Sequence, residues 1–491
     1  MAKQSAAFEL TLPPQASDTA TYEWLYQVLR TEILEGRLRG GTRLPSSRDL
    51  AKRYRLSRGT IVNAFELLKS EGYLRGSTGS GTFVSDVLPD ELLKVKPKSG
   101  AHTQRSLPRR HLAAYGRRVQ YESNFEAQPM RAFRANLPAI DLFPMKLWST
   151  LASRRMRTSS DLLIGCDPIG YPPLREAVAD YLNAWRGVKC SPEQILIVSG
   201  VQEAIDIVAR VVLDARDRVC VEDPGYPAAR MVFEAAGAKV IPVPVDAEGI
   251  GVDDRRMRGA RLVFVTPGHQ SPLGVTMSLR RRLALLEWAQ RNEALIFEDD
   301  YDSEYRYSSR PMPALQGMDR NGNVVFAGSF NKVLFPSLRL GYVVAPADLI
   351  ARFEAVKSIT SRHAQLFDQA VLCDFIAGGH FARHLRRMRE IYAERLAALL
   401  KAVREHLAGV LEVPDIEAGL QTVAWLSPNV DANVVEQRSR AQGLHVTALS
   451  KFAIAPLSRD GIQLGFAAIT PAQIRRGVHD LARVLDTLAD S

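Results

Sequence analysis

The chain has 491 residues, which is more than one ordinary domain holds and predicts two or three domains. Hydrophobic residues make up 46% and charged residues 24%, a composition that excludes a largely disordered chain, and the four cysteines form no CxxC pair that would indicate a disulfide scaffold or a zinc site. The 64 basic against 54 acidic residues leave a net charge of +10, which is compatible with nucleic-acid binding without requiring it.

Residues 15–86 are predicted to form a first domain. TYEWLYQVLRTEILEGRL repeats apolar residues with helical spacing, and Gly36 ends this helix. A short helix in SRDLAKRYR follows, capped by Ser46 or Ser47, and Ser57 caps the next helix in SRGTIVNAFELLKSEG. YLRGSTGSGTFVS has two strand-like runs around a Gly/Ser turn and predicts a hairpin. This order of elements is that of a winged helix-turn-helix.

A recognition helix reaches base edges with short polar and cationic side chains in its first exposed turn. Arg58 could bind a guanine through both of its terminal nitrogens, and Arg48 in the preceding helix could bind a phosphate or a guanine. Any amphipathic helix carries such residues on its solvent-exposed face, so one helix alone is weak evidence for DNA binding. The whole stretch LPSSRDLAKRYRLSRGTIVNAFELLKSEGYLRGSTGSGTFV, however, resembles the GntR-family winged helix. The candidate DNA contacts are Arg48, Ser57, Arg58, Thr60, Asn63, Gly79 and Gly81.

Residues 87–130 are predicted to be a basic linker. No acidic residue occurs between Leu92 and Tyr121, whereas eight lysines and arginines do, and Pro97 and Pro108 interrupt any long helix. The linker is either a solvated tether or a tether that also touches DNA phosphates.

Residues 131–491 alternate apolar strand-like runs with amphipathic helices, as in ILIVSG followed by VQEAIDIVARVVL. Continuous apolar runs between such helices predict an α/β domain with a largely parallel sheet covered on both faces.

GSFNKVLFPSLRLGY places Lys332 among small residues, seven positions before Arg339. A lysine that forms a Schiff base needs a lowered pKa and neighbours that hold a charged cofactor, although a lysine taken alone is more often a surface residue. In ALIFEDDYDSEYRY, alternation puts Asp299 and Tyr301 on one face of a strand, where they suit a protonated pyridine nitrogen and a phenolic oxygen. The alternatives are a solvated strand end or a metal site, and the metal site is disfavoured because no histidine stands near in sequence.

Two further segments suit a phosphorylated, flat cofactor. Gly200, Val201 and Gln202 follow a strand and begin a helix, where free backbone N–H groups bind phosphate. Tyr226 in EDPGYPAAR follows another strand and could stack on a heterocycle, or could simply be a packed loop residue.

Together the segments DPIGYPPLREAVADYL, SGVQEA, EDPGY, TPGHQSPLGVTMS, EDDYDSE and SFNKVLFPSLRLGY resemble the fold-type I aminotransferases, which use pyridoxal 5′-phosphate (PLP). The resemblance implies that Lys332 binds PLP covalently, that Asp299 pairs with the pyridine nitrogen and that Tyr301 bonds the ring oxygen. It further implies phosphate contacts from Arg339, Ser329 and residues 200–202, ring stacking by Tyr226, and a cofactor contact from Ser271.

A GntR-type winged helix joined to an aminotransferase-like domain resembles the MocR subfamily of transcription regulators. This resemblance implies a head-to-tail homodimer that binds a double-stranded DNA operator and senses PLP or a PLP–amine adduct. The alternative is an active aminotransferase with an accessory DNA-binding domain; a third hypothesis is a scaffold that has lost PLP. The effector is left open between PLP itself and an amine such as a γ-amino acid or a sulfonated amine.

Two departures from the aminotransferase pattern argue against turnover. Ser271-Pro272-Leu273-Gly274 stands where aminotransferases carry Asn-Pro-x-Gly, and His269 or Gln270 could substitute for the missing asparagine. Gln463 in GIQLGFA stands where an arginine binds the substrate α-carboxylate. No apolar run approaches the ~20 residues that cross a bilayer, and the N-terminus lacks the apolar core of a secretion signal, so a cytoplasmic protein is expected.

Overall fold

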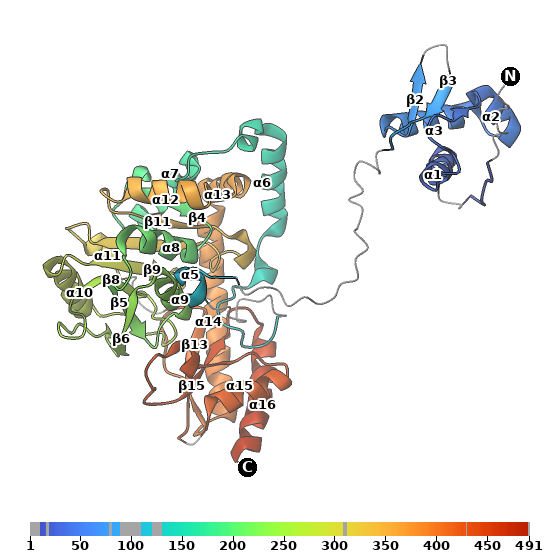
Figure 1. Ribbon diagram of the computed structural model, residues 1–491. Helices are drawn as coiled ribbons and strands as arrows, with labels where there is room; N and C mark the ends of the chain where they lie inside the picture. The colour runs from blue at the N-terminus through green and yellow to red at the C-terminus, as the bar shows by residue number, and fades with distance from the viewer. Residues whose placement is uncertain are drawn as a thin grey trace. The chain divides into compact units, whose positions relative to one another are not determined.

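The computed structural model describes residues 10–15, 19–77, 81–88, 110–119, 130–307, 312–428 and 430–489. The chain divides into two compact units, Met1–Arg109 and Arg110–Ser491, and each has its own hydrophobic core (Figure 1).

The first unit is a winged helix-turn-helix. Its elements are α1 (Thr21–Leu34), β1 (Arg43–Leu44), α2 (Ser47–Tyr54), α3 (Arg58–Ser70), β2 (Leu74–Ser77) and β3 (Gly81–Val84), and the strand order is β1-β3-β2. Ser46 caps α2 and Ser57 caps α3, each by accepting the backbone N–H three residues on. The apolar stripe of α3 packs Ile61, Phe65 and Leu68 against α1, so both helices are fixed beneath the hairpin.

An eight-stranded sheet organises the second unit. Its strands are β4 (Ile195–Val198), β5 (Arg218–Asp223), β6 (Lys239–Asp246), β7 (Gly249–Ile250), β8 (Ala260–Val265), β9 (Leu295–Asp300), β10 (Val324–Ser329) and β11 (Gly341–Val344). The order is β4-β11-β10-β9-β8-β5-β6-β7, with β11 and β7 antiparallel to their neighbours and the other strands aligned in one direction. The α/β fold with a largely parallel sheet is therefore confirmed.

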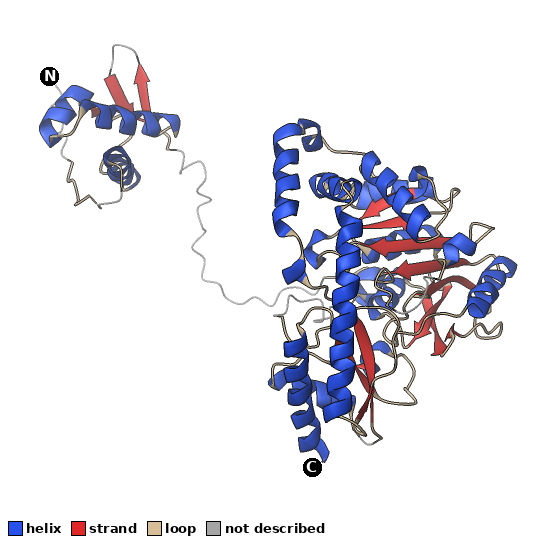
Figure 2. Cartoon of the chain, turned by 180° about the vertical axis from the view of Figure 1, so that it is seen from behind, coloured by secondary structure: helices blue, strands red, loops and turns tan. Residues whose placement is uncertain are grey.

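Helices cover both faces of this sheet (Figures 1 and 2). One face packs on α8 (Val201–Val212), α9 (Pro227–Ala236) and α12 (Ile350–Thr360). The other packs on α7 (Pro172–Trp185), α10 (Leu279–Arg291), α11 (Leu315–Met318) and α13 (Leu366–Ala377). Successive strand residues alternate between the two cores, as Leu196 and Ile197 do, which explains why these strands read as continuous apolar runs.

A smaller antiparallel sheet follows the long helix α14 (His380–His406), which Figure 2 shows running past both sheets. Its strands are β12 (Leu411–Glu412), β13 (Gln421–Leu426), β14 (Thr447–Ala448) and β15 (Gly461–Gly465), in the order β12-β13-β15-β14. Helices α14, α15 (Ala432–Ala441) and α16 (Pro471–Ala489) cover one face of this sheet. The strand residues Ala424, Ile462 and Leu464 point from that face into the core. The alternate residues Gln421 and Gln463 therefore lie on the other face.

Two further helices precede the large sheet. Helix α6 (Met145–Thr158) packs on α13, and the short helix α5 (Ala114–Arg118) contacts α9. Helix α5 falls within the stretch predicted as a linker, of which residues 89–109 and 120–129 lie outside the described residues.

Candidate functional site

The candidate site lies where several strands of the large sheet end. Strands β4, β5, β8, β9 and β10 run in the same direction, so their carboxyl ends meet at one edge, together with the beginning of the reversed strand β11. Ligands of such sheets bind at this edge. The topology thus gathers Gly200, Tyr226, Asp299, Lys332 and Arg339, which are spread over 140 residues of sequence.

Lys332 is partly buried, just beyond β10. Its Nζ donates a hydrogen bond to the carbonyl oxygen of Asn136 at 3.1 Å. Burial lowers the pKa of the Lys332 amine to about 8, and the charges of Arg134 and Arg339 lower it further against the opposing carboxylates of Asp302 and Asp299. At pH 7 about one amine in ten is therefore neutral and nucleophilic.

Asp299 is buried at the end of β9, and its Oδ1 has no hydrogen-bond partner among the described residues. Burial, followed by the charge of Asp300, raises the pKa of the Asp299 carboxyl well above its usual value. A cationic partner such as a protonated pyridine nitrogen would satisfy this oxygen and favour the ionised form. Asp300 points to the opposite face, where it pairs with the buried guanidinium of Arg186.

The turn between β4 and α8 brings polar groups close to Gly200. Gly200 has φ +128°, and a Cβ there would lie 3.2 Å from Asn331 Nδ2 and 3.5 Å from both terminal nitrogens of Arg339. An amide, a guanidinium and the first N–H groups of α8, including those of Val201 and Gln202, therefore border one small space. The hydroxyl of Ser329 accepts the N–H of Asn331 at 3.2 Å, which steadies the same loop.

Tyr226 precedes α9 and stacks on Phe264, with ring centroids 6.4 Å apart and planes inclined by 28°. Burial and the neighbouring charge of Asp299 raise the pKa of the Tyr226 phenol, which keeps the ring neutral. Its flat, uncharged face suits stacking on a heterocycle.

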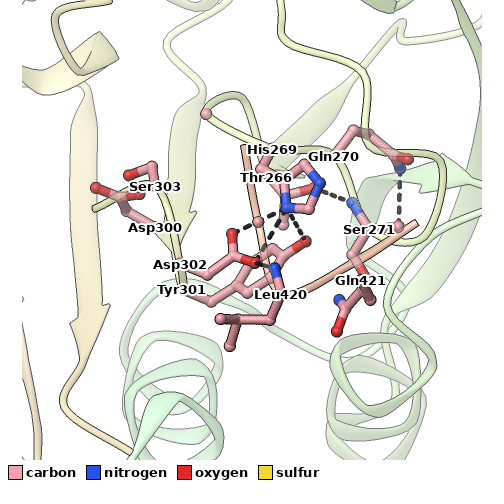
Figure 3. Close-up of polar contacts among 12 residues, drawn as sticks. Thr266, His269, Gln270, Ser271, Asp300, Tyr301, Asp302, Ser303, Leu420 and Gln421 are labelled. Atoms are coloured by element: carbon pink, nitrogen blue, oxygen red, sulfur yellow. Dashed lines mark hydrogen bonds and ion pairs between the residues drawn. The ribbon is translucent and has the colours of Figure 1, made fainter. Parts of the chain in front are cut away.

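Tyr301 and His269 meet at the same edge of the sheet. His269 Nδ1 lies 3.1 Å from Tyr301 Oη and 2.9 Å from Asp302 Oδ1, an arrangement drawn in Figure 3. Burial and the charge of Asp302 raise the pKa of Tyr301 well above its usual value, whereas a hydrogen bond with the Ser271 side chain lowers it. Gln270 is occupied elsewhere: its Nε2 donates to the carbonyl oxygens of Pro224 and Ser271, and its Oε1 accepts the N–H of Leu273. Of the two candidates for the missing asparagine, the structure brings His269 next to Tyr301.

The small sheet supplies a neutral wall. Gln421 Oε1 accepts the N–H of Asn136 at 2.6 Å, and the Asn136 carbonyl is the one that receives Lys332. Gln463 pairs with Val423 in register and so faces the same side as Gln421. The Nε2 of Gln463 is buried without a hydrogen-bond partner among the described residues.

The DNA-binding candidates lie at the start of α3 and around the hairpin. Arg58 and Asn63 on α3 and Arg48 on α2 are exposed, and the two arginines form no ion pair among the described residues. The hydroxyl of Ser57, by contrast, accepts the N–H of Thr60 at 3.0 Å and lies 2.8 Å from its Oγ1, so this pair caps the helix.

Gly81 begins β3 with φ +105°, and a Cβ there would lie 2.9 Å from Arg43 Nε, so this glycine makes room for an arginine. Gly79 lies outside the described residues. Sequence reasoning did not single out Arg43, which lies on β1 and pairs with Phe83 on β3. It also missed Asn136, whose distance of 196 residues from Lys332 leaves no local signal.

Comparison with known proteins matches both units to family models. Residues 144–481 match the aminotransferase class I and II family, and residues 21–84 match the bacterial regulatory proteins of the gntR family. The probable rhizopine catabolism regulatory protein MocR of Rhizobium meliloti is 40% identical over 479 residues, covering 97% of this chain and 96% of that protein. The chain belongs to the MocR-type regulators of the GntR family.

Other relatives agree with this assignment. The pyridoxine biosynthesis transcriptional regulator PdxR of Corynebacterium glutamicum is 31% identical, covering 90% of this chain and 91% of that protein. Among solved structures, the Pyrococcus horikoshii kynurenine aminotransferase in complex with PMP is similar with a TM-score of 0.70 and 26% identity, over 77% of this chain and 97% of that chain.

This MocR-type regulator therefore combines a DNA-binding winged helix with a domain of the PLP-dependent aminotransferase fold. It is a transcription regulator by family, and the GntR-type domain is its DNA-binding part. None of the helices in the described part of the chain is long and apolar enough to cross a membrane.

Proposed function

We propose that this regulator senses PLP, or an adduct of PLP with an amine, at the strand-end site, and that occupancy of the site changes its affinity for an operator. The observation that carries the proposal is the pairing of Lys332, whose amine has a pKa of about 8, with the unpartnered Oδ1 of Asp299. A nucleophilic amine and an unsatisfied buried carboxyl oxygen are what a pyridine aldehyde requires on its two sides.

The residues present fit PLP. Arg339, Asn331 and the N-terminus of α8 would hold the phosphate, Tyr226 would cover the ring, and Asp299 would bond the pyridine nitrogen. When bound, PLP supplies an aldehyde that condenses with amines and a ring that withdraws electrons. Lys332 must lose its proton before it can react, and the neighbouring arginines favour that loss.

The small-sheet wall argues for sensing over turnover. An aminotransferase must bind its substrate carboxylate in every cycle, and a charged hydrogen bond for that purpose contributes about 1.5–3 kcal/mol. Gln463 offers only a neutral amide at its position on β15. An active aminotransferase with an accessory DNA-binding domain is the second candidate, favoured by the similarity of the whole domain to a kynurenine aminotransferase.

In a sensor, binding at the cofactor site must also affect the DNA-binding domain, and α9 could connect the site to the segment before it. Tyr226 stands at its N-terminal end, and at its other end Arg118 of α5 donates two hydrogen bonds to the Ala235 carbonyl, at 3.1 and 3.0 Å. Gly237, at φ +92°, leaves space for this guanidinium, since a Cβ there would lie 3.1 Å from it. The cofactor side of α9 is thereby joined to the segment that leads toward the winged helix.

Operator affinity should differ between the cofactor-free and the PLP-loaded protein. A ligand shifts a conformational equilibrium only if it binds the two states unequally, and coupling energies are typically about 1–3 kcal/mol, which corresponds to a change of about 5- to 150-fold. Fluorescence anisotropy with operator DNA, followed by a panel of amines with PLP present, measures this change. Equal affinities would remove PLP as the signal, and transamination of a common α-amino acid near the enzyme median of about 10 s⁻¹ would favour the second candidate.

Arg118→Ala should uncouple the signal while leaving PLP binding intact. We expect the visible absorbance of the bound cofactor to be unchanged and most of the PLP-dependent change in operator affinity to be lost, because α5 would no longer be fixed to α9. Arg117→Ala is the matched control: it removes the same charge from the same helix, but its guanidinium bonds only the Leu112 carbonyl among the described residues. If both variants respond to PLP alike, the path through α9 is wrong.

The proposed dimer is a head-to-tail homodimer, which would set the spacing of two winged helices on operator half-sites. Three apolar side chains on and just after α6 are largely exposed and suit such an interface: Met156 (77%), Leu163 (88%) and Ile164 (88%).

A further inference from the structure

His269, Asp302 and Tyr301 form a buried cluster whose proton arrangement follows from its contacts. His269 Nδ1 faces three oxygens: Asp302 Oδ1 at 2.9 Å, Asp302 Oδ2 at 3.1 Å and Tyr301 Oη at 3.1 Å. Asp302 Oδ2 also accepts the N–H of Leu420 at 3.2 Å. Figure 3 shows the imidazole above the carboxylate, with the phenol beside it.

A carboxylate can only accept hydrogen bonds, so the nitrogen that faces Asp302 must carry the proton. A protonated Nδ1 has no lone pair left, and Tyr301 therefore cannot donate to it. Tyr301 Oη accepts a share of the Nδ1–H instead, so the phenolic proton of Tyr301 is directed away from His269, toward the Ser271 side chain or a ligand.

The imidazole is held in this orientation by two glycines. A Cβ at Gly419 would lie 1.9 Å from His269 Cε1, and one at Gly274 would lie 3.2 Å from Nε2. His269 is buried, with 4% of its surface exposed, and its Nε2 has no hydrogen-bond partner among the described residues. A proton on Nε2 would be buried without an acceptor, so the contacts assign the neutral ring with hydrogen on Nδ1.

We propose that His269, oriented by Asp302, is a positioning residue that makes Tyr301 an obligatory hydrogen-bond donor to the ring oxygen of the cofactor. The inference rests on the proposed function for its ligand, but the proton arrangement exists without any ligand. His269 would support the ring oxygen only through Tyr301 and would not itself touch the cofactor, unlike the asparagine that Ser271 replaces.

The arrangement is tested first in the cofactor-free protein. Histidine labelled with ¹⁵N reports the tautomer through its long-range ¹H–¹⁵N correlations, and the His269 signal is assigned by its loss in His269→Gln. We expect the Nδ1–H tautomer in the wild type and the Nε2–H tautomer in Asp302→Asn, whose amide can donate to Nδ1. A wild-type ring with hydrogen on Nε2 alone, or on both nitrogens, overturns the proposal even if PLP is never bound.

The consequence is tested in the PLP-loaded protein through the pH at which its visible absorbance changes. A hydrogen-bond donor to the ring oxygen draws electron density from that oxygen, which then holds a nearby proton less tightly. Loss of the donor should therefore raise the pH at which the absorbance changes. We expect Tyr301→Phe and His269→Gln to raise it, each by about one pH unit. His269→Asn should stay near the wild type, because the asparagine amide can place a donor where Nδ1 stands.

A double-variant cycle separates positioning from general damage. If His269 acts through Tyr301, His269→Gln combined with Tyr301→Phe should shift the transition no further than Tyr301→Phe alone. Additive shifts, or a His269→Gln transition at the wild-type pH, would refute the positioning role. Thermal unfolding of each variant checks that the fold persists. A protein with the expected tautomer that gives no visible band with PLP would contradict the proposed function and leave the proton arrangement standing.

Discussion

Lys332→Ala should abolish covalent cofactor binding completely. Lys332 is the amine that stands opposite Asp299 at the strand ends, and its pKa of about 8 makes it reactive near neutral pH. We expect no visible absorbance from a protein-bound pyridoxal group and no labelled peptide after borohydride reduction and mass spectrometry. The phosphate contacts proposed for Gly200 and Arg339 do not involve Lys332, so weak, reversible binding of PLP should persist.

The pH dependence of the wild type has a definite sign. Because burial lowers the pKa of Lys332 to about 8, the neutral, reactive amine is scarce below that pH and predominant above it. The rate of cofactor attachment should therefore rise about tenfold per pH unit up to pH 7 and level off above 8. Lys332→Arg is the matched control, since it keeps a cation but offers no neutral amine. A borohydride-trapped label in either variant would show that another lysine carries the cofactor.

Operator binding should be lost when the winged helix is removed. A fragment comprising residues 110–491 retains the aminotransferase-like unit intact but lacks α3 and the hairpin. In the full chain, Arg58→Ala should relax base preference by about 1–3 kcal/mol if its guanidinium bonds a guanine, whereas Arg48→Ala should weaken binding to all sequences alike if it bonds a phosphate. Anisotropy with the operator and with single-base variants distinguishes the two effects.

Arg37→Ala is the control for charge alone. This arginine belongs to the same unit, but its guanidinium is already paired with Glu32 at 2.7 Å, so its loss should alter DNA affinity little. Operator binding by the 110–491 fragment, or equal losses in the Arg37 and Arg58 variants, would contradict the assignment of DNA recognition to α3.

The elements of the winged helix and the cofactor motifs could be predicted from sequence because their signals are local. Ser57 and Gly36 mark helix ends through the backbone groups of adjacent residues, and the apolar stripe of α3 follows from 3.6-residue periodicity. Lys332 and Asp299 are recognisable because each stands in a compact segment at the end of a strand. The alternation that sends Asp299 and Asp300 to opposite faces is likewise a property of any strand.

What the sequence could not decide is which distant groups meet. By sequence alone, either His269 or Gln270 could substitute for the missing asparagine. Only the packing of the imidazole between Gly419 and Gly274 places it against Tyr301. Asn136 reaches Lys332 because the small sheet brings Gln421 against it, across 285 residues. Helix caps and periodicity are set within one or two turns of chain, whereas the groups that meet at the strand ends depend on the order of strands in two sheets, which tertiary packing alone determines.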